Sequence, residues 1–254
     1  MKLKERTVLI TGGSSGIGQE LAKQLLRRGN TVIVTGRDQS RLDATSRNLP
    51  GVHVIRSDVG DPAGVVSLYE TVTRRFPKLD TLVNNAGIMR NLNLSLPREL
   101  QDATREIDIN LCGPIWMVQQ FLPHLRTRED ALIVNVSSGL AFVPLPIAPM
   151  YCATKAALHS YTQSLRAQLA GSRVTVVELA PPGTETPLFR GEFAEEMRGQ
   201  TGMDVTVLAA RAIAGIEAGR LEIRPGLANV LKMMSRVAPN LMLKQMTKMV
   251  AAKP

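Results

Sequence analysis

The sequence predicts an α/β fold in which a parallel sheet of about seven strands lies between two layers of helices, as in doubly wound sheets. Short runs rich in β-branched residues recur along the chain, and most are followed by a segment with helical periodicity. A glycine-rich turn joins the first run to the first helix. Alternating strands and helices favour parallel pairing with helices on both faces. The expected strands are 7–11, 31–35, 53–56, 79–83, 131–136, 174–179 and 221–225.

Composition indicates a globular protein with a sizeable core. Of the 254 residues, 44% are hydrophobic and 21% are charged, which is ordinary for such proteins. No repeat, low-complexity tract or linker divides the chain, so we expect one domain over 1–254. The net charge of +9 is spread along the chain and suits an anionic cofactor. With one Trp, three Tyr and five Phe, and no interleaving of aromatic and basic residues, no nucleic acid site is expected.

The chain has no pattern typical of a membrane span or an export signal. No apolar stretch reaches the roughly 20 residues that a spanning helix needs. The apolar run after the N-terminal charges is too short for the core of a signal peptide. Cys112 and Cys152 have neither CxxC spacing nor a neighbouring histidine pattern, so they fit packing roles in a reducing compartment. We therefore expect a cytoplasmic protein without a metal site.

The first strand is followed by Gly12, Gly16 and Gly18 and then by a helix that ends near Gly29. This layout presents backbone N–H groups and a helix N-terminus to a phosphate. The spacing is Gly-x-x-x-Gly-x-Gly rather than the commoner dinucleotide fingerprint, and a tight turn without a ligand is the alternative. The candidate cofactor contacts in this turn are Gly12, Ser14, Ser15, Gly16, Ile17 and Gly18.

The second strand ends at Gly36, Arg37 and Asp38, where a dinucleotide-binding fold meets the adenosine ribose. An acidic side chain there bonds the ribose 2′-hydroxyl, whereas an arginine suits a 2′-phosphate. Asp38 can also serve as the N-cap of the next helix. Because Arg37 directly follows the strand end and Gly36, we favour NADP(H) as the cofactor, with NAD(H) as the alternative.

Further polar and small residues follow the third and fourth strands. Asp58 and Val59 end the third, where Asp58 either bonds the adenine amine or caps the following helix. Asn85, Ala86 and Gly87 follow the fourth, in a sequence that suits backbone lying close to a ligand.

A long helical pattern over 99–126 contains Asn110, Cys112, Gly113 and Pro114, which are costly together inside a helix. The cluster predicts a local kink with a functional purpose, and a break between two shorter helices is the alternative. His124 and His159 are expected to be unpaired helix residues rather than metal ligands.

Ser138 lies at the end of the fifth strand, and Tyr151 and Lys155 open the following helix. Positions i and i+4 share a helical face, so the phenol and the ammonium can act at one site. A phenol has a pKa of about 10, and a nearby ammonium should lower it toward neutral pH. The three residues together resemble a proton-transfer site, although Tyr-x-x-x-Lys alone is a frequent chance pattern.

The sixth strand runs into a proline- and glycine-rich loop that contains Pro181, Thr184 and Thr186. Residues 188–203 mix apolar and charged groups between glycines, which fits a mobile lid over the substrate. Residues 226–254 form a basic, methionine-rich extension interrupted by Pro239. It could pack over the substrate mouth, contact another subunit or lie on an anionic membrane surface. We rank membrane contact last, because its apolar residues are no richer than core packing requires.

With these motifs placed, the chain from about 4 to 225 resembles the short-chain dehydrogenase/reductase family, a single-domain branch with a Rossmann-type sheet and a Tyr-x-x-x-Lys motif. Through EIRPG and its C-terminal region it is also similar to bacterial DltE-like oxidoreductases. The motifs that carry the resemblance are TGGSSGIG (11–18), GRD (36–38), DV (58–59), NNAG (84–87), Asn110, Ser138 and YCATK (151–155).

The resemblance implies a role for each matching residue. Tyr151 would be the general acid or base, Lys155 would lower its pKa, Ser138 would orient the substrate oxygen, and Asn110 would hold a water linked to Lys155. The implied cofactor contacts are the glycine turn, Arg37, Asp58, Val59, Asn85, Ala86, Gly87, Tyr151, Lys155, Pro181, Thr184 and Thr186. Pro182 stands where the family usually has glycine, which makes the threonine contacts less certain. Members usually pair through the long helices, here 99–126 and 152–169, so a homodimer or homotetramer is expected.

Two classes of function fit these observations besides a membrane-surface protein. The first is an NADP(H)-dependent oxidoreductase that acts on a small carbonyl/alcohol pair. The second is a non-catalytic nucleotide-binding sensor or scaffold of the same fold. Such a protein is expected to lose one of Ser138, Tyr151 or Lys155, and this chain keeps all three.

Overall fold

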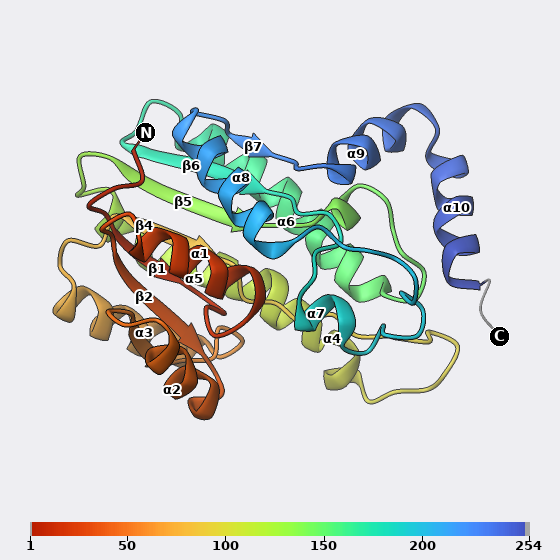
Figure 1. Cartoon of the computed structure of the whole chain (residues 1–254), viewed down its shortest axis with the longest axis horizontal. Helices are drawn as coiled ribbons and strands as arrows, with labels where there is room; N and C mark the ends of the chain where they lie inside the picture. Colours follow the sequence, from red (N-terminus) through yellow and green to blue (C-terminus); the bar gives the residue numbers. More distant parts are fainter. Residues whose placement is uncertain (1, 252–254) are drawn as a thin grey trace.

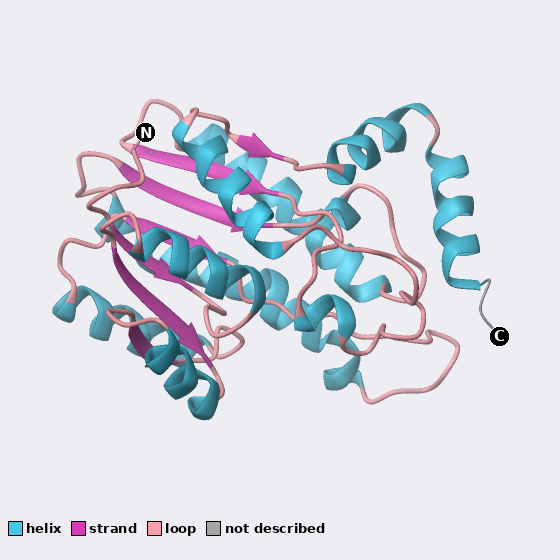
Figure 2. Cartoon of the chain, viewed as in Figure 1, coloured by secondary structure: helices cyan, strands magenta, loops and turns pink. Residues whose placement is uncertain are grey.

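A computed structural model describes residues 2–251, with Ala251 described by its backbone alone. Seven parallel strands form one twisted sheet in the order β3-β2-β1-β4-β5-β6-β7 (Figures 1 and 2). The strand number and the parallel pairing confirm the predicted fold class. The strands are β1 Thr7–Ile10, β2 Thr31–Gly36, β3 His53–Arg56, β4 Thr81–Asn84, β5 Ala131–Val136, β6 Val174–Leu179 and β7 Glu222–Ile223.

Helices cover both faces of this sheet, and further helices lie beyond the carboxyl ends of its strands (Figure 1). Successive side chains of a strand point to opposite faces, so Val8 and Ile10 pack with α1, α2 and α8, whereas Leu9 packs with α3 and α5. The helices are α1 Gly16–Leu26, α2 Gln39–Asn48, α3 Pro62–Arg75, α4 Leu100–Ile107, α5 Gly113–Leu125, α6 Pro149–Gln168, α7 Pro187–Arg190, α8 Val205–Glu217, α9 Leu227–Val237 and α10 Pro239–Ala251.

The strand order reverses between β1 and β4. The chain builds outward from β1 through β2 to β3 and then returns to β4 on the other side of β1. In doubly wound sheets, the carboxyl ends of the strands beside this switch point leave a crevice in which ligands bind. The glycine turn after β1 and the Asn85 segment after β4 both lie at this crevice.

The predicted irregularity in the long helix is a π-helical turn, Asp108–Cys112, between α4 and α5. Helical backbone continues through this turn, since its caps have right-handed helical angles. The irregularity predicted at this cluster is therefore present as a π-helical turn, and a full break between two helices is wrong. Pro114, which has no backbone N–H to donate, is the second residue of α5 and directly follows this turn.

Beyond the sheet, a third apolar cluster joins three segments that are far apart in sequence. It contains Tyr151 from α6, Phe193 and Met197 from the predicted lid, and Met242 and Met246 from α10. The lid therefore contributes fully packed side chains, and the C-terminal extension covers this end of the fold. Pro239 begins α10, so the predicted interruption at this residue is confirmed. Within the described residues, no helix combines the length and the apolar character needed to span a membrane.

Candidate active site

The turn between β1 and α1 has room for a ligand only because its key positions are glycines. Gly12 has a φ of +65°, and a Cβ placed there would lie 2.8 Å from the Ala86 Cα. A Cβ on Gly18 would lie 2.6 Å from the Gly12 carbonyl oxygen. Ser15 is the N-cap of α1 and makes no side-chain capping bond, and the first residues of α1, Gly16 and Ile17, line the cleft. This cradle fits the pyrophosphate of a dinucleotide.

Asn85 braces the glycine turn from the neighbouring strand. Its amide nitrogen donates to the carbonyl oxygens of Thr11 at 2.9 Å and Gly12 at 3.1 Å. The backbone N–H groups of Asn85 and Ala86 both donate to the Thr11 hydroxyl at 3.0 Å. The amide therefore fixes the shape of the cradle, while Asn85, Ala86 and Gly87 also line the cleft.

After β2, where the sequence predicts the adenosine ribose, Asp38 is the N-cap of helix α2. Its carboxylate accepts from the Arg41 N–H at 3.1 Å and from the Ser40 hydroxyl at 2.6 Å, as expected for an N-cap. Arg37 is 45% exposed at the rim of the cleft and lies 3.7 Å from Asp58. Arg41, which the sequence did not indicate, also lines the cleft at this end.

Gly36 lets the glycine turn lie against the end of β2. A Cβ there would be 2.9 Å from the Ser14 hydroxyl oxygen. Asp58 accepts from the Gly60 N–H at 2.9 Å, and the N-cap of α3 is Asp61. The helix-capping alternative for Asp58 is therefore wrong, and both Asp58 and Val59 line the cleft.

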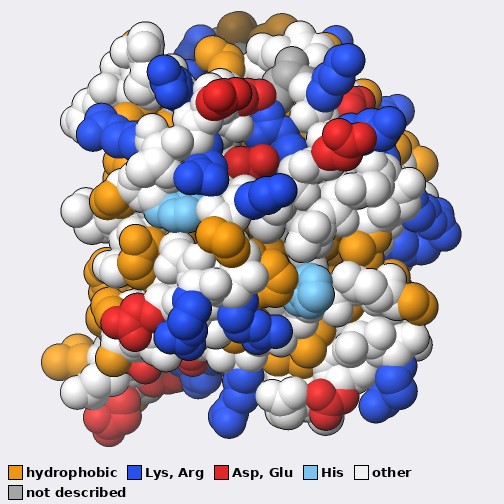
Figure 3. Space-filling model, turned by 90° about the vertical axis from the view of Figure 1, so that its left-hand side faces the viewer, with side chains coloured by type: hydrophobic (Ala, Val, Ile, Leu, Met, Phe, Trp, Pro, Cys, Tyr) orange, Lys and Arg blue, Asp and Glu red, His pale blue; other side chains and the backbone are white. Residues whose placement is uncertain are grey.

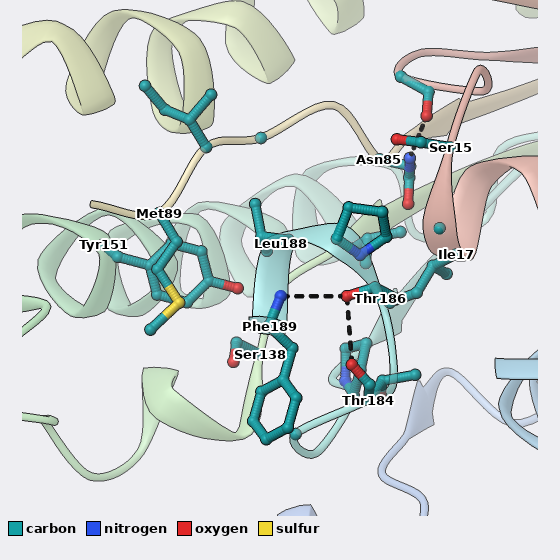
Figure 4. A pocket seen from close by; sticks show the side chains of 18 of the residues that line it. Ser15, Ile17, Asn85, Met89, Ser138, Tyr151, Thr184, Thr186, Leu188 and Phe189 are labelled. Carbon is teal, nitrogen blue, oxygen red and sulfur yellow. Dashed lines mark hydrogen bonds between the residues drawn. The ribbon is translucent and has the colours of Figure 1, made fainter. Parts of the chain in front are cut away.

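Ser138, Tyr151 and Lys155 line the same cleft. Ser138 follows β5, and Tyr151 lies in the first turn of α6. They are 8% and 7% exposed, and Figure 4 shows both beside Met89 around one part of the pocket. The Ser138 oxygen also accepts from the Leu140 N–H at 3.1 Å, which holds the start of the 3-10 turn Gly139–Ala141.

Burial is the largest influence on the pKa values of Tyr151 and Lys155. Desolvation raises the pKa of Tyr151 to about 12, and a hydrogen bond with Ser138 acts in the opposite direction. The expectation that the lysine lowers this pKa below its usual value is wrong for the structure as it stands. Lys155 lies 5.6 Å from the centre of the phenol ring and donates to the Val136 carbonyl at 2.9 Å. Burial also lowers the pKa of Lys155 to about 8, because the charged form loses its hydration.

Asn110 lies in the π-helical turn and is fully buried. Its amide accepts from the Ile88 N–H at 2.8 Å and donates to the Ile88 carbonyl at 2.8 Å. It also donates to the Thr154 hydroxyl at 3.2 Å. A Cβ on Gly87 would lie 3.1 Å from the Asn110 oxygen and 3.6 Å from the Lys155 nitrogen, so the two side chains meet at Gly87. Asn110 therefore joins the Ile88 segment to α6 beside Lys155.

The loop after β6 lies against the glycine turn. Thr186 is the N-cap of α7, with its oxygen 3.3 Å from the Phe189 nitrogen, and it donates to the Thr184 carbonyl at 3.1 Å (Figure 4). Its side chain would contact a Cβ on Gly16 at 3.2 Å. Both threonines and Pro181 line the cleft, as predicted.

The cleft has a volume of about 1060 Å³ and is apolar beyond Tyr151. The apolar side chains beyond Tyr151 come from four segments: the loop after β4, the loop after β5, residues 188–203, and helices α9 and α10. Their apolar lining residues are Met89, Leu140, Leu145, Leu188, Phe189, Phe193, Met197, Leu227, Leu231, Met246 and Met249.

The two residues after Met89, Arg90 and Asn91, make polar contacts that could not be predicted from the sequence. Arg90 lies 2.8 Å from Asp102 and 3.5 Å from the fully buried Glu106, whose pKa burial raises. The neighbouring Asn91 donates two hydrogen bonds to the segment 188–203. Its backbone N–H donates to the Glu192 carboxylate at 2.8 Å, and its side-chain amide donates to the Glu196 carboxylate at 2.6 Å. The only available signal was the charge of these residues, which does not reveal their partners.

His159 is not unpaired, contrary to the expectation from sequence. Its Nδ1 lies 2.7 Å from the fully buried Glu178 of β6, which also accepts from the Ser137 hydroxyl. His159, Glu178 and Glu222 bring potential ligand atoms within 4.8 Å of one another. However, Glu222 is ion-paired with Lys232, and both oxygens of Glu178 already have partners. This cluster is therefore a hydrogen-bonded support beneath Ser137 rather than a metal centre.

Comparison with known proteins identifies the family. Residues 6–197 match the family model described as short chain dehydrogenase. The chain is 42% identical to an uncharacterized oxidoreductase, DltE, of Bacillus subtilis over 224 residues, which are 88% of this chain and 89% of the relative.

Solved structures show the same fold with nicotinamide cofactors bound. A short chain dehydrogenase from Burkholderia cenocepacia in complex with NADP is 25% identical, with a TM-score of 0.83 over 97% of this chain and 99% of that one. A 3-ketoacyl-(acyl-carrier-protein) reductase from Brucella melitensis complexed with NADH is 30% identical, with a TM-score of 0.76 over 85% and 91%. The chain therefore belongs to the short-chain dehydrogenase/reductase family of NAD(P)-dependent oxidoreductases.

Proposed function

We propose that this protein is an NADP(H)-dependent oxidoreductase that interconverts an apolar carbonyl compound and its alcohol, with Tyr151 as the general acid and base. The observation that carries the proposal is that Ser138, Tyr151 and Lys155 line the same cleft as the glycine turn. A dinucleotide held at that turn extends along the cleft toward the phenol.

The chain's own residues have to orient the substrate and move one proton. When bound, the nicotinamide supplies or accepts the hydride. With a pKa raised to about 12, Tyr151 keeps its proton at neutral pH and can donate it to a carbonyl oxygen during reduction. Ser138 donates a second hydrogen bond to the same oxygen. The phenolate that remains lies near the Lys155 side chain, whose nitrogen is 5.6 Å from the centre of the ring, and alcohol oxidation follows the reverse order.

The preference for NADP(H) rests on the end of β2. Asp38 uses its carboxylate as the cap of α2, so it is a poor partner for a ribose hydroxyl. Arg37 and Arg41 line the cleft beside the Ser14 hydroxyl, which lies against Gly36. Two guanidinium groups and a hydroxyl suit a 2′-phosphate.

We also propose that the chain is a single domain in the cytoplasm that forms a homodimer or homotetramer through α4, α5 and α6. Sedimentation velocity of the purified protein tests the assembly. A monomer at all concentrations would contradict it.

Tyr151→Phe is the test of the catalytic assignment. The variant should bind NADPH as the wild type does, because the ring is kept, and should lose at least about 100-fold in kcat, the usual contribution of a positioned acid. The measurement is NADPH oxidation across a panel of ketones, aldehydes, quinones and sterols. Undiminished turnover in the variant would refute the role of Tyr151. Tight NADPH binding without turnover of any panel member by the wild type would favour a sensor or scaffold.

Arg37→Ala is the test of cofactor preference. The substitution should weaken NADPH binding by roughly 10-fold or more and leave NADH binding nearly unchanged, because only NADPH carries the extra phosphate. Fluorescence titration with both cofactors measures the ratio. An equal loss for both would show that Arg37 does not contact the phosphate.

A further inference from the structure

The C-terminal hairpin of α9 and α10 leaves many apolar side chains in solvent. Six of the thirteen exposed large apolar side chains of the described residues lie on these two helices. Val237 is 76% exposed, Leu227 60% and Met233 58%. From the sequence, we expect no more apolar residues in this segment than core packing requires. The structure shows that this expectation is wrong, because these six side chains are exposed. The exposed set is Leu227, Val230, Met233, Val237, Leu241 and Leu243.

These side chains form an ordered stripe on α9. Val230, Met233 and Val237 have the i, i+3, i+7 spacing of one helical face. The opposite face of α9, through Ala228 and Leu231, lies against the turn after Ser138, since both would contact a Cβ on Gly139 within 3.3 Å. The helix is therefore held by its inner face and presents a second apolar face outward.

Charge indicates what this outer face contacts. Residues 226–254 contain four lysines and one arginine but no aspartate or glutamate. Arg236, Lys244 and Lys248 are exposed, and the two lysines lie one turn apart on α10. At the opposite end of the molecule, acidic and basic side chains are intermixed (Figure 3). The hairpin thus combines an apolar stripe with basic charge of a single sign, which is typical of surfaces that bind anionic lipid.

A second copy of the chain fits this face less well. A two-fold interface places the same patch against itself, so it would bring the Arg236, Lys244 and Lys248 of both copies together. The segment has no acidic side chain to offset that repulsion.

We propose that α9 and α10 dock this protein on an anionic lipid surface, with the α9 stripe in the interfacial layer and the α10 lysines at the headgroups. Leu227, Leu231, Met246 and Met249 of the same hairpin line the apolar half of the cleft. Docking therefore places the substrate pocket beside the lipid, from which an apolar substrate can enter. The docking itself does not depend on the catalytic assignment.

Vesicle co-sedimentation of the full-length protein tests the proposal. The wild type should bind vesicles of phosphatidylcholine with phosphatidylglycerol, bind phosphatidylcholine alone far less, and be released by high salt. Each basic side chain near an anionic surface strengthens binding roughly five-fold, so Lys244→Gln with Lys248→Gln should weaken it roughly 20- to 30-fold. Met233→Gln with Val237→Asn should also weaken binding, including the part that resists salt.

Substitutions on α3 and in the turn directly after it are the controls, because they remove exposed basic and apolar side chains from another surface. Arg74→Gln with Lys78→Gln, and Val66→Asn, should leave vesicle binding unchanged. Circular dichroism confirms that every variant is folded. Equal binding to neutral and anionic vesicles, or equal losses in control and hairpin variants, would overturn the proposal. A hairpin variant that changes the sedimentation coefficient without changing vesicle binding would instead identify a subunit interface and would also overturn it.

Discussion

Gly18→Ala tests whether the close approach of backbone at Gly18 controls cofactor binding, apart from the effect of glycine on the stability of helix α1. Gly18 lies in α1, where alanine favours the helix by about 1 kcal/mol over glycine. The added Cβ, however, would lie 2.5 Å from the Asn85 amide nitrogen and 2.6 Å from the Gly12 carbonyl oxygen. Both distances are far below van der Waals contact, so the glycine turn and its brace have to move apart.

The size of the effect follows from the bonds that this movement breaks. Asn85 donates to Thr11 and Gly12, and each bond contributes about 0.5–1.5 kcal/mol. If the cofactor has to restore the original cradle against the clash in order to bind, the cost is about 1–3 kcal/mol for the two bonds, which corresponds to roughly 5- to 150-fold weaker cofactor binding. Overpacking costs about 1–3 kcal/mol of folding stability and is partly offset by the helix propensity of alanine. Cofactor binding should therefore suffer more than stability.

Gly29→Ala is the matched control at the other end of α1. Gly29 has a φ of +79° and has no atom within 4 Å of a Cβ, so alanine there is strained but clashes with nothing. This variant should lose about 1 kcal/mol of stability and keep its affinity for NADPH. Fluorescence titration gives the dissociation constant, and thermal unfolding gives the stability. If Gly18→Ala bound NADPH as tightly as the wild type, the close approach of backbone at the cradle would not control cofactor binding.

Two further predictions concern buried charges. Burial lowers the pKa of Lys155 from 10.5 to about 8, so the unfolded chain binds more protons between those pH values and stability should rise with pH there. Lys155→Met should therefore stabilise the cofactor-free protein by roughly 1–3 kcal/mol at pH 7, with a smaller gain near pH 10, as measured by urea unfolding. The same variant should have no turnover, and a lower free energy of unfolding at pH 7 would contradict the prediction. Glu178→Ala should cost roughly 1–3 kcal/mol in the same assay, since it leaves the buried Ser137 hydroxyl and the partly buried His159 ring without their partner, and an unchanged midpoint would show that Glu178 is not a support for β6.

The strands and the ends of the strands could be predicted from the sequence because both depend on local chemistry. Runs of β-branched residues are buried on both faces of a parallel sheet, so they stand out without any tertiary information. Small and polar residues follow those runs, and Gly12, Asp58, Asn85 and Ser138 all lie at the cleft as expected. The Asp38 cap could also be predicted, since a cap acts on the next turn of its own chain.

Pairings across the fold could not be predicted, because they depend on which elements become neighbours. His159 meets Glu178 only because α6 packs against β6, and Arg90 meets Glu106 only because the loop after β4 crosses α4. The direction of the Tyr151 pKa was missed for the same reason. The sequence shows an ammonium one helical turn away, but only the structure shows how completely the phenol is desolvated.

By itself, the sequence determined that this chain forms a doubly wound sheet with a dinucleotide turn at one strand end and a phenol, an ammonium and a hydroxyl at another. These features follow from residue type and spacing along the chain. Only the tertiary structure decided which apolar residues of the C-terminal helices are buried and which face the solvent, and how charge is buried around the catalytic pair. Burial is a property of the assembled fold, since it depends on which surfaces distant segments cover.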